Sequence, residues 1–370
     1  MNYMCRFQRL IFVFGGLFFL FGCSEPEPIR IGFIADFEGR ASELGISGRN
    51  AVQLAVDEVN AAGGINGRKI ELLVRDDMST KEGGANAARS LVKAQVRAII
   101  GPIRSVVAGG VVPIINEAEI VTVSPTVLAA SLVGKDDHFF RMASSSRKDA
   151  EHYARRLYAE GYNKIAVASD ANNELFTGPW VETFRAEFEK NGGTVTASIP
   201  FDAGNSKGLS ATVAALLKAQ TDAVLVLANG IDTAQIAQQI KKTNEHMQLL
   251  ATSWSASENL VVLGGRAAEG MLLGENYDRN DTSAQYVRFR DAFTGLFGVL
   301  PSQSSITSYD AAQILFAAMR NTDGAADLKS KLLGIRGLKG LQQEIGFDGF
   351  GDGDRALTLV VVKDGEFIRK

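Results

Sequence analysis

The sequence predicts an α/β fold built on two doubly wound parallel sheets. Short apolar, β-prone segments alternate with longer segments in which apolar residues recur at helical spacing. This alternation runs through two blocks, Ile29–Met142 and Ser144–Gly274, with the polar Ser144-Ser145-Ser146 as the connector between them. Each block has enough units for one doubly wound sheet, and together they are too long for a single sheet.

The elements of the first block follow from its apolar runs. Ile29–Ala35 is apolar and β-prone, which predicts a strand. In Ser47–Ala62 the apolar residues recur at helical spacing, and Gly63-Gly64 can end the helix in the left-handed conformation. The other elements expected here are the strands Arg68–Arg75, Ala98–Ile100 and Val121–Val123 and the helices Lys81–Ala94 and Ser105–Glu117.

The second block and the C-terminal region continue the pattern. The strands expected in the second block are Ile165–Ser169, Thr194–Ile199, Ala223–Leu227 and Gln248–Ala251, and the helices are Leu175–Lys190, Leu209–Lys218 and Thr233–Lys241. The helices Ser283–Phe297 and Ser305–Met319 and the strands Leu357–Val362 and Glu366–Arg369 should follow, with Asp364-Gly365 as a hairpin turn. The helical spacing of Trp180, Phe184 and Phe188 predicts core residues.

The N-terminus has the pattern of an export signal. Arg6 and Arg9 precede the apolar run Leu10–Phe21, which ends in Leu20-Phe21-Gly22-Cys23. The run is too short to span a bilayer as a helix. The segment resembles a bacterial lipoprotein signal, so we expect residues 1–22 to be removed, Cys23 to be lipidated and residues 23–28 to form a tether. An ordinary secretory signal and an uncleaved anchor are the alternatives, and all three place the rest of the chain outside the cytoplasm.

Composition excludes several classes of protein. The chain is 46% hydrophobic and 22% charged with a formal net charge of −3, and its basic residues are scattered, so we expect no nucleic-acid partner. Cys5 would be removed with the signal and Cys23 would be lipidated, which leaves no pair of cysteines for a disulfide. The three histidines show no ligand spacing, the nucleotide-binding glycine motifs and the Gly-x-Ser-x-Gly elbow are absent, and Asp348–Asp354 is a turn rather than a calcium loop. We therefore expect no cofactor, no metal and no enzymatic activity.

Two turns are candidate ligand sites, because ligands of open α/β sheets bind beyond the carboxyl ends of strands. The turn Ile100–Ser105 leads from a strand into a helix whose first N–H groups could hold a carboxylate. Ser105 could equally be only the N-cap of that helix. Val123–Thr126 is a second turn with the same two interpretations.

The chain resembles the periplasmic solute-binding proteins of the branched-chain amino acid type. The stretches that carry this resemblance are Ile31–Ile34, Gly48–Asp57, Val59–Gly67, Asp76-Asp77, Ile100–Pro102, Val123–Pro125, Ala268–Gly270 and Tyr309–Ala311. The resemblance implies two lobes joined by three hinge crossings near Met142, Glu275 and Gly346. Lobe one would comprise residues 29–142 and 275–345, and lobe two residues 143–274 and 346–370.

The resemblance also implies a ligand site in the cleft between the lobes. Its residues would be Arg104, Ser105, Thr126, Val127 and Leu128 from lobe one and Phe176, Asn229, Ser253 and Trp254 from lobe two. Ser105 would hold the ligand carboxylate. Arg104 could add a bidentate contact to this carboxylate or could equally point into solvent.

The chain departs from the amino-acid binders at three points. Leu128 stands where they typically have a threonine, Ser253 stands where they place an acid for the ligand ammonium, and Ser79 and Arg104 replace the usual disulfide. A buried ammonium without a carboxylate is costly, so an amino acid would need another acid, from the set Glu38, Glu43, Asp170, Glu174 and Glu275.

These departures favour a small carboxylate or amide with an apolar body, although branched-chain amino acids remain within the prediction. The expected function is the ligand-binding component of an ATP-driven importer, with a membrane permease as partner and a lipid anchor in the periplasm or at the cell surface. The alternative is a lipoprotein that uses the same fold for ligand sensing or for interactions in the envelope.

Overall fold

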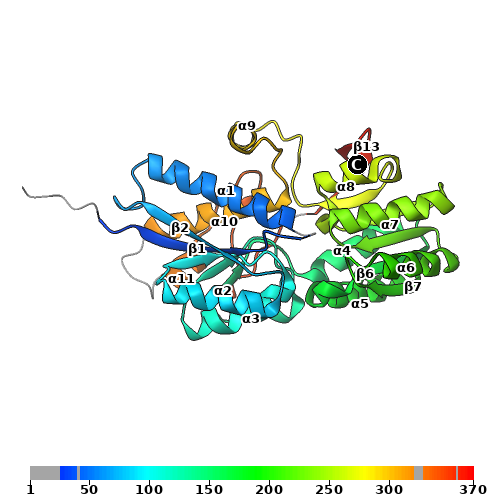
Figure 1. The fold of residues 1–370 in the computed structure, drawn as a ribbon, viewed down its shortest axis with the longest axis horizontal. Coiled ribbons are helices and arrows are strands. Elements are labelled where there is room, and N and C mark those ends of the chain that lie inside the picture. The colour runs from blue at the N-terminus through cyan, green and yellow to red at the C-terminus, as the bar shows by residue number, and fades with distance from the viewer. Residues whose placement is uncertain (1–25, 40–41, 321–327, 356) are drawn as a thin grey trace, which may run out of the picture.

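The computed structural model describes residues 26–39, 42–320, 328–355 and 357–370. It contains a five-stranded and a seven-stranded sheet, each with helices on both faces, which lie end to end in an elongated molecule (Figure 1). The two parallel-sheet units predicted from the sequence are therefore observed, and we call them lobe one and lobe two. The predicted signal peptide and Cys23 lie outside the described residues.

Lobe one is built on the five-stranded sheet, which is parallel throughout with the order β2-β1-β3-β4-β5. Its strands are β1 (Ile29–Ala35), β2 (Ile70–Asp76), β3 (Ala98–Ile100), β4 (Thr122–Ser124) and β5 (Phe139–Arg141). Its helices are α1 (Ser42–Ala61), α2 (Lys81–Lys93), α3 (Ser105–Glu117), α9 (Ala284–Phe297), α10 (Gln303–Arg320) and α11 (Leu328–Gly334). The short strands β11 (Leu338–Lys339) and β12 (Glu344–Ile345) pair beside it.

Alternation along β1 explains why helices cover both faces of this sheet. Ile31 and Phe33 belong to the core shared with α1, α9 and α10, whereas Ile34 belongs to the core under α2 and α3. All three side chains are fully buried. A strand whose side chains are buried on both faces reads as a continuous apolar run, as the sequence from Ile31 to Ala35 does.

Lobe two is built on the seven-stranded sheet, with the order β14-β13-β10-β9-β8-β6-β7. Its strands are β6 (Lys164–Asp170), β7 (Thr194–Phe201), β8 (Ala223–Leu227), β9 (Gln248–Ala251), β10 (Leu272–Glu275), β13 (Thr358–Lys363) and β14 (Glu366–Arg369). Only β13 and β14 run antiparallel to their neighbours. The helices are α4 (Ser146–Ala159), α5 (Glu174–Lys190), α6 (Ser206–Lys218), α7 (Gly230–Thr243) and α8 (Glu258–Gly264).

The predicted aromatic core residues are confirmed. Trp180, Phe184 and Phe188 are fully buried on the inner face of α5 and stack in succession, with ring centroids 5.2 and 5.3 Å apart. The indole N–H of Trp180 donates to Asp149 on α4 at 2.7 Å, so the one polar group of this stack is paired. The stack fixes α5 against α4 and holds the start of α5 at the edge that faces lobe one.

The chain passes between the lobes three times, after β5, after β10 and after β12. The first and third crossings are tied together, because Arg141 at the end of β5 is buried and donates from Nε and Nη2 to Asp352 at 2.9 and 2.6 Å. Backbone hydrogen bonds from Arg141 to Gly351 and from Gly353 to Arg141 add to this contact. The segment Asp348–Asp354 is thus a turn bound to a crossing, as predicted.

Several elements differ from the sequence prediction. Strands β1, β3, β8, β9 and β14 have the predicted bounds, but α1 begins five residues early at Ser42, and α4, α8, α11, β5, β10, β11 and β12 were not predicted. The turn after β4 leads to no α-helix, since only the 3-10 turn Ala130–Leu132 follows it. Among the described residues, no helix has the length and apolar character needed to span a membrane.

Candidate functional site

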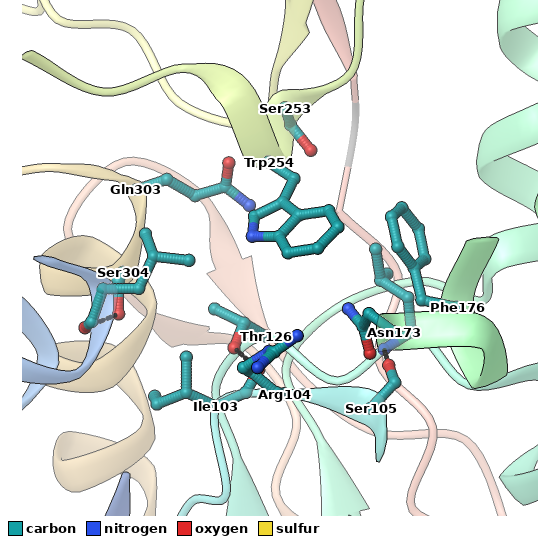
Figure 2. Close-up of a pocket in the computed structure, with 12 residues that line it drawn as sticks. Ile103, Arg104, Ser105, Thr126, Asn173, Phe176, Ser253, Trp254, Gln303 and Ser304 are labelled. Atoms are coloured by element: carbon teal, nitrogen blue, oxygen red, sulfur yellow. Dashed lines mark hydrogen bonds between the residues drawn. The ribbon is translucent and has the colours of Figure 1, made fainter. Parts of the chain in front are cut away.

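A cavity lies between the lobes where the carboxyl ends of both parallel sheets meet (Figure 2). The order of the first sheet reverses between β1 and β3 and that of the second between β6 and β8, and such reversals open a crevice at the strand ends. Lobe one supplies the wall from the turns after β3 and β4 and from α1 and α10. Lobe two supplies it from the turns after β6 and β9. The lining residues are Leu44, Ile103, Arg104, Ser105, Thr126, Leu128, Asn173, Phe176, Ser253, Trp254, Gln303 and Ser304.

Ser105 is the first residue of α3 and is not its N-cap. Arg104 occupies the cap position without a side-chain cap, so the N-cap interpretation of Ser105 is wrong. The Ser105 hydroxyl instead accepts a hydrogen bond from the Leu128 N–H at 3.2 Å, which joins the turns after β3 and β4. The hydroxyl hydrogen is free of this bond and can be donated to a ligand oxygen, because a serine hydroxyl both donates and accepts.

The start of α3 carries backbone N–H donors that face both lobes. The first intrahelical bond runs from Ala108 N–H to Arg104 O, so the preceding N–H groups lack helical partners. One of them, Val106 N–H, donates to Asn173 Oδ1 of lobe two at 3.1 Å. A side-chain oxygen from the opposite lobe thus already occupies one donor of the positive helix end, which shows that this end accepts oxygen ligands.

Arg104 bridges the lobes at the floor of the cavity. Its guanidinium carbon lies 5.9 Å from the centre of the Trp254 ring, and Nη2 lies 3.5 Å from the backbone oxygen of Asn172. The side chain is 8% exposed, and Nε has no hydrogen-bond partner among the described residues. Of the described side chains that line the cavity, Arg104 is the only charged one. The cavity therefore has a net positive wall.

The rest of the wall is apolar and aromatic. Phe176 and Trp254 meet edge to face with ring centroids 5.8 Å apart, and Leu44, Ile103 and Leu128 complete the surface. Figure 2 shows the Trp254 ring facing the Arg104 guanidinium, with Phe176 to one side. This combination suits a ligand with a flat or branched apolar body and a single anionic end.

The predicted site residues fall into three groups. Arg104, Ser105, Thr126, Leu128, Phe176, Ser253 and Trp254 come together in the cavity. Val127 does not line it, because its side chain is fully buried in the core beneath α3. Asn229 caps α7 by accepting from Asp232 N–H at 3.0 Å and lines a neighbouring cavity.

The Thr126 hydroxyl is already engaged, since it donates to the Ile103 carbonyl at 2.6 Å. The hydroxyl oxygen can therefore only accept a hydrogen bond from a ligand. A carboxylate is itself an acceptor, so it cannot bind to this oxygen. The role of Thr126 in the wall is therefore to hold the turn after β3.

Five lining residues escaped the sequence reasoning, namely Leu44, Ile103, Asn173, Gln303 and Ser304. Ser304 donates to the Leu44 carbonyl at 2.7 Å, which brings α10 against the start of α1 across more than 250 residues of sequence. No local pattern reports such a contact. Asn173 lies in the polar turn between β6 and α5, where the sequence shows the turn but not its contact with α3.

None of the five acids considered as ammonium partners lines the cavity. Glu43 accepts from Asn259 of lobe two at 2.5 Å, and Glu275 pairs with Arg279 at 2.8 Å. Glu38 and Asp170 line the neighbouring cavity instead, and Glu174 is exposed. An α-amino group bound in this cavity would have no carboxylate beside it among the described lining residues.

The described residues contain no cluster of three or more histidine, cysteine or acidic side chains arranged to hold a metal ion.

A family model described as periplasmic binding protein matches residues 28–366. The chain belongs to the periplasmic binding protein family. The family match covers all three crossings and both sheets except the end of β14, and it agrees with the resemblance inferred from the sequence.

Known relatives of this family share both length and fold with the chain. A Leu/Ile/Val-binding protein BraC3 from Rhizobium johnstonii is 24% identical over 327 residues, which are 88% of each chain. The Leu/Ile/Val-binding protein of Escherichia coli strain K12 is 22% identical over 308 residues, 83% of each chain. The leucine-binding protein LivK of Thermotoga maritima superposes with a TM-score of 0.85 at 23% identity and covers 92% of this chain and 97% of its own.

A solute-binding protein from R. palustris, solved in complex with benzoate, superposes with a TM-score of 0.84 at 17% identity, over 92% of this chain and 95% of its own. These superpositions establish the type I periplasmic binding fold with its two lobes and three crossings.

Proposed function

We propose that the chain is the extracytoplasmic solute-binding component of an ATP-driven importer and acts by binding rather than by catalysis. Its ligand would be a branched-chain amino acid or a related small carboxylate or amide, held between the lobes. The curated relatives that cover most of the chain are named for leucine, isoleucine and valine. The cognate partner would be the membrane permease of the importer.

One observation carries this proposal: an interlobe cavity with a serine hydroxyl, a helix N-terminus and an arginine at one side and a largely apolar wall elsewhere. Charge-assisted hydrogen bonds from Ser105 and Arg104 would hold a carboxylate. Because no described acid lines the cavity, carboxylates without an adjacent ammonium should bind better than leucine. The benzoate complex of a protein with the same fold supports the chemical plausibility of such a ligand.

The mechanism would be closure of the two lobes on the ligand by rotation about the crossings near Met142, Glu275 and Gly346. Ser105 and Arg104 contact the ligand from lobe one, and Phe176 and Trp254 contact it from lobe two. Ligand contacts made by both lobes exist only when the lobes are closed, so binding shifts the population toward the closed state that the permease would recognise.

The test is titration calorimetry and thermal shift on the purified mature protein with benzoate, isocaproate, isobutyramide and leucine. A ligand at a hundredfold excess over its dissociation constant stabilises the folded state by about 2.7 kcal/mol. We expect a shift with at least one simple carboxylate and a smaller shift with leucine. A larger shift with leucine would contradict the argument from the missing acid. No shift with any compound would favour the sensing or interaction role instead.

Ser105→Ala should weaken the best ligand by roughly 10- to 100-fold, the effect of losing a hydrogen bond to a charged group. Ser124→Ala is the matched control. Its hydroxyl donates to the Pro102 carbonyl at 2.8 Å and accepts from Val127 N–H at 3.1 Å in the adjoining turns, but it does not line the cavity. If both variants weakened binding equally, Ser105 would act only by holding the turns.

We also propose that Cys23 is lipidated and anchors the mature chain to a membrane in the periplasm or at the cell surface. The support is the sequence pattern around Cys23. Incorporation of labelled palmitate into the wild-type protein and its loss in Cys23→Ala would test this. Incorporation that survives the substitution would refute it.

A further inference from the structure

We propose that the ligand extends past Arg104 into a second, acidic cavity between the lobes and carries a basic group at the end opposite its carboxylate. This inference rests on the proposed function and specifies the class of ligand. The second cavity adjoins the first at Arg104, which is the residue that lines both spaces. Its polar wall comes from Glu38, Asp76 and Ser79 of lobe one and Asp170, Asn172 and Asn229 of lobe two.

The second cavity carries an excess of negative charge. Glu38, Asp76 and Asp170 line it, and Arg104 is the single cation among the described residues of its wall. Asp170 is 1% exposed, and its burial raises its pKa to about 6 despite the hydrogen bond from Asn172 N–H and the charge of Arg104. A nearby cation would stabilise the ionised form of this buried carboxylate, because its present neighbours compensate its charge only in part.

Two more carboxylates stand behind the lobe-one wall. Asp36 and Asp77 follow the paired ends of β1 and β2, where Ala35 lies beside Asp76 in the sheet. Burial, with the charge of Asp36 second, raises the pKa of Asp77 to about 7. Ser79, which lines the cavity, is the link to both: its hydroxyl donates to Asp36 and its N–H donates to Asp77, each at 2.8 Å.

Unpartnered polar atoms indicate that this junction lacks a binding partner. Arg104 Nε, Asp36 Oδ1 and Asp77 Oδ2 are buried and have no hydrogen-bond partner among the described residues. Buried polar groups are nearly always hydrogen-bonded, so the Nε atom of Arg104, which lines both cavities, calls for a ligand or solvent, whereas Asp36 and Asp77 line neither cavity. Arg104, more than nine-tenths buried and facing both cavities, is positioned to receive an anion from the ligand side.

The separation of charge defines the ligand. The donors for a carboxylate, Ser105 and Arg104, belong to the first cavity, and the acceptors for a cation, Glu38, Asp76 and Asp170, belong to the second. An α-amino acid has its ammonium one carbon from its carboxylate and would place it in the first cavity, where no acid lines the wall among the described residues. A carboxylate joined to an amine or guanidine by a chain or ring reaches both sides.

The test compares two ligands of the same shape, para-ethylbenzoate and para-aminomethylbenzoate, by calorimetry on the purified mature protein at pH 7.5 and low salt. We expect the amine to bind about tenfold more tightly or better, and the gain to shrink as salt screens the charges. Asp170→Asn should bring the affinity ratio of the two ligands toward one, since the amide keeps an acceptor for Asn172 N–H but removes the charge. Glu174→Gln, an exposed acid outside the cavity, should leave the ratio unchanged.

The other possible results of this experiment would each overturn the inferred ligand class. Glu38→Gln, at the exposed rim, replaces Asp170→Asn if the latter fails to fold. Equal or weaker binding of the amine would overturn the inference and leave the proposed function standing. Failure of these and all other carboxylates to bind would overturn both. A thermal shift produced by millimolar calcium or magnesium that also removes the preference for the amine would make the cavity a metal site, which likewise overturns the inference.

Discussion

Asp77→Asn should stabilise the protein above neutral pH and have little effect in mild acid. Asp77 is fully buried directly after β2, and its pKa is raised from 3.8 to about 7, chiefly by burial and then by the charge of Asp36. The folded state therefore keeps a proton that the unfolded chain releases above about pH 4. The contribution of Asp77 to the free energy of unfolding is therefore fully present below about pH 4 and is lost as the pH rises through about 7.

The size of the effect follows from the shift. A displacement of about three pKa units at about 1.4 kcal/mol each corresponds to about 4 kcal/mol between pH 4 and pH 8. Asparagine does not ionise, and its amide oxygen can still accept the Ser79 N–H that Asp77 Oδ1 accepts at 2.8 Å. Its NH₂ group can in addition donate to Asp36 Oδ1, which has no partner among the described residues. Most of the 4 kcal/mol should thus be recovered at pH 8.

The assay is urea unfolding followed by circular dichroism at pH 4.5, 6 and 8. Asp76→Asn is the matched control, because Asp76 Oδ1 accepts Met78 N–H at 2.7 Å in the same manner, but the residue is only partly buried. We expect the gain of Asp77→Asn over wild type to grow steadily with pH and that of Asp76→Asn to stay small. A constant difference at all three values would mean that Asp77 ionises normally in the folded protein and would refute the argument.

Two further substitutions test the hinge and the packing of lobe one. Asp352→Asn leaves the Arg141 guanidinium buried without its carboxylate and should lower the free energy of unfolding by about 3 kcal/mol in urea titrations; an unchanged midpoint would show that the pair contributes nothing. Gly45→Ala places a methyl group 1.9 Å from the Asp36 carbonyl and should lower the melting temperature sharply, whereas Gly295→Ala meets no atom within 4 Å and should raise it slightly. Similar shifts for both would exclude steric conflict as the cause.

Elements buried on both faces were the easiest to predict from the sequence. Strands β1, β8 and β9 contain runs without polar side chains, namely Ile31–Ala35, Ala223–Leu227 and Leu249–Ala251. The polar residues Asp36, Asp222 and Thr252 border these runs, and such local contrast marks the strands. Helix α4 was missed although Ala150, Tyr153, Ala154 and Leu157 recur at helical spacing and are buried. The many charged residues between them, on the exposed face, obscure the pattern.

The start of α1 shows what local reasoning cannot supply. Its first turns contain glycine and polar residues, which are weak helix formers. Contacts with α10 stabilise them, since Ser47 bonds to Ser305 at 2.5 Å and Ser304 bonds to the Leu44 carbonyl. The same contacts place Leu44, Gln303 and Ser304 in the cavity wall. The strand-end turns of the site could be predicted because strand ends define them, but this wall depends on two helices that only the folded chain brings together.

Ser79 and Arg104, the two positions at which the resemblance places a disulfide, have opposite roles in the folded chain. Ser79 turns inward and hydrogen-bonds to Asp36, while Arg104 turns across the cleft to Trp254 and Asn172 of lobe two. A disulfide would have held both turns within lobe one. Its replacement leaves a buried cation between a cavity without described acids and one with three, so the charge that attracts a carboxylate also repels an ammonium beside it. We therefore expect Arg104 to discriminate against α-amino acids and in favour of ligands whose opposite charges lie far apart.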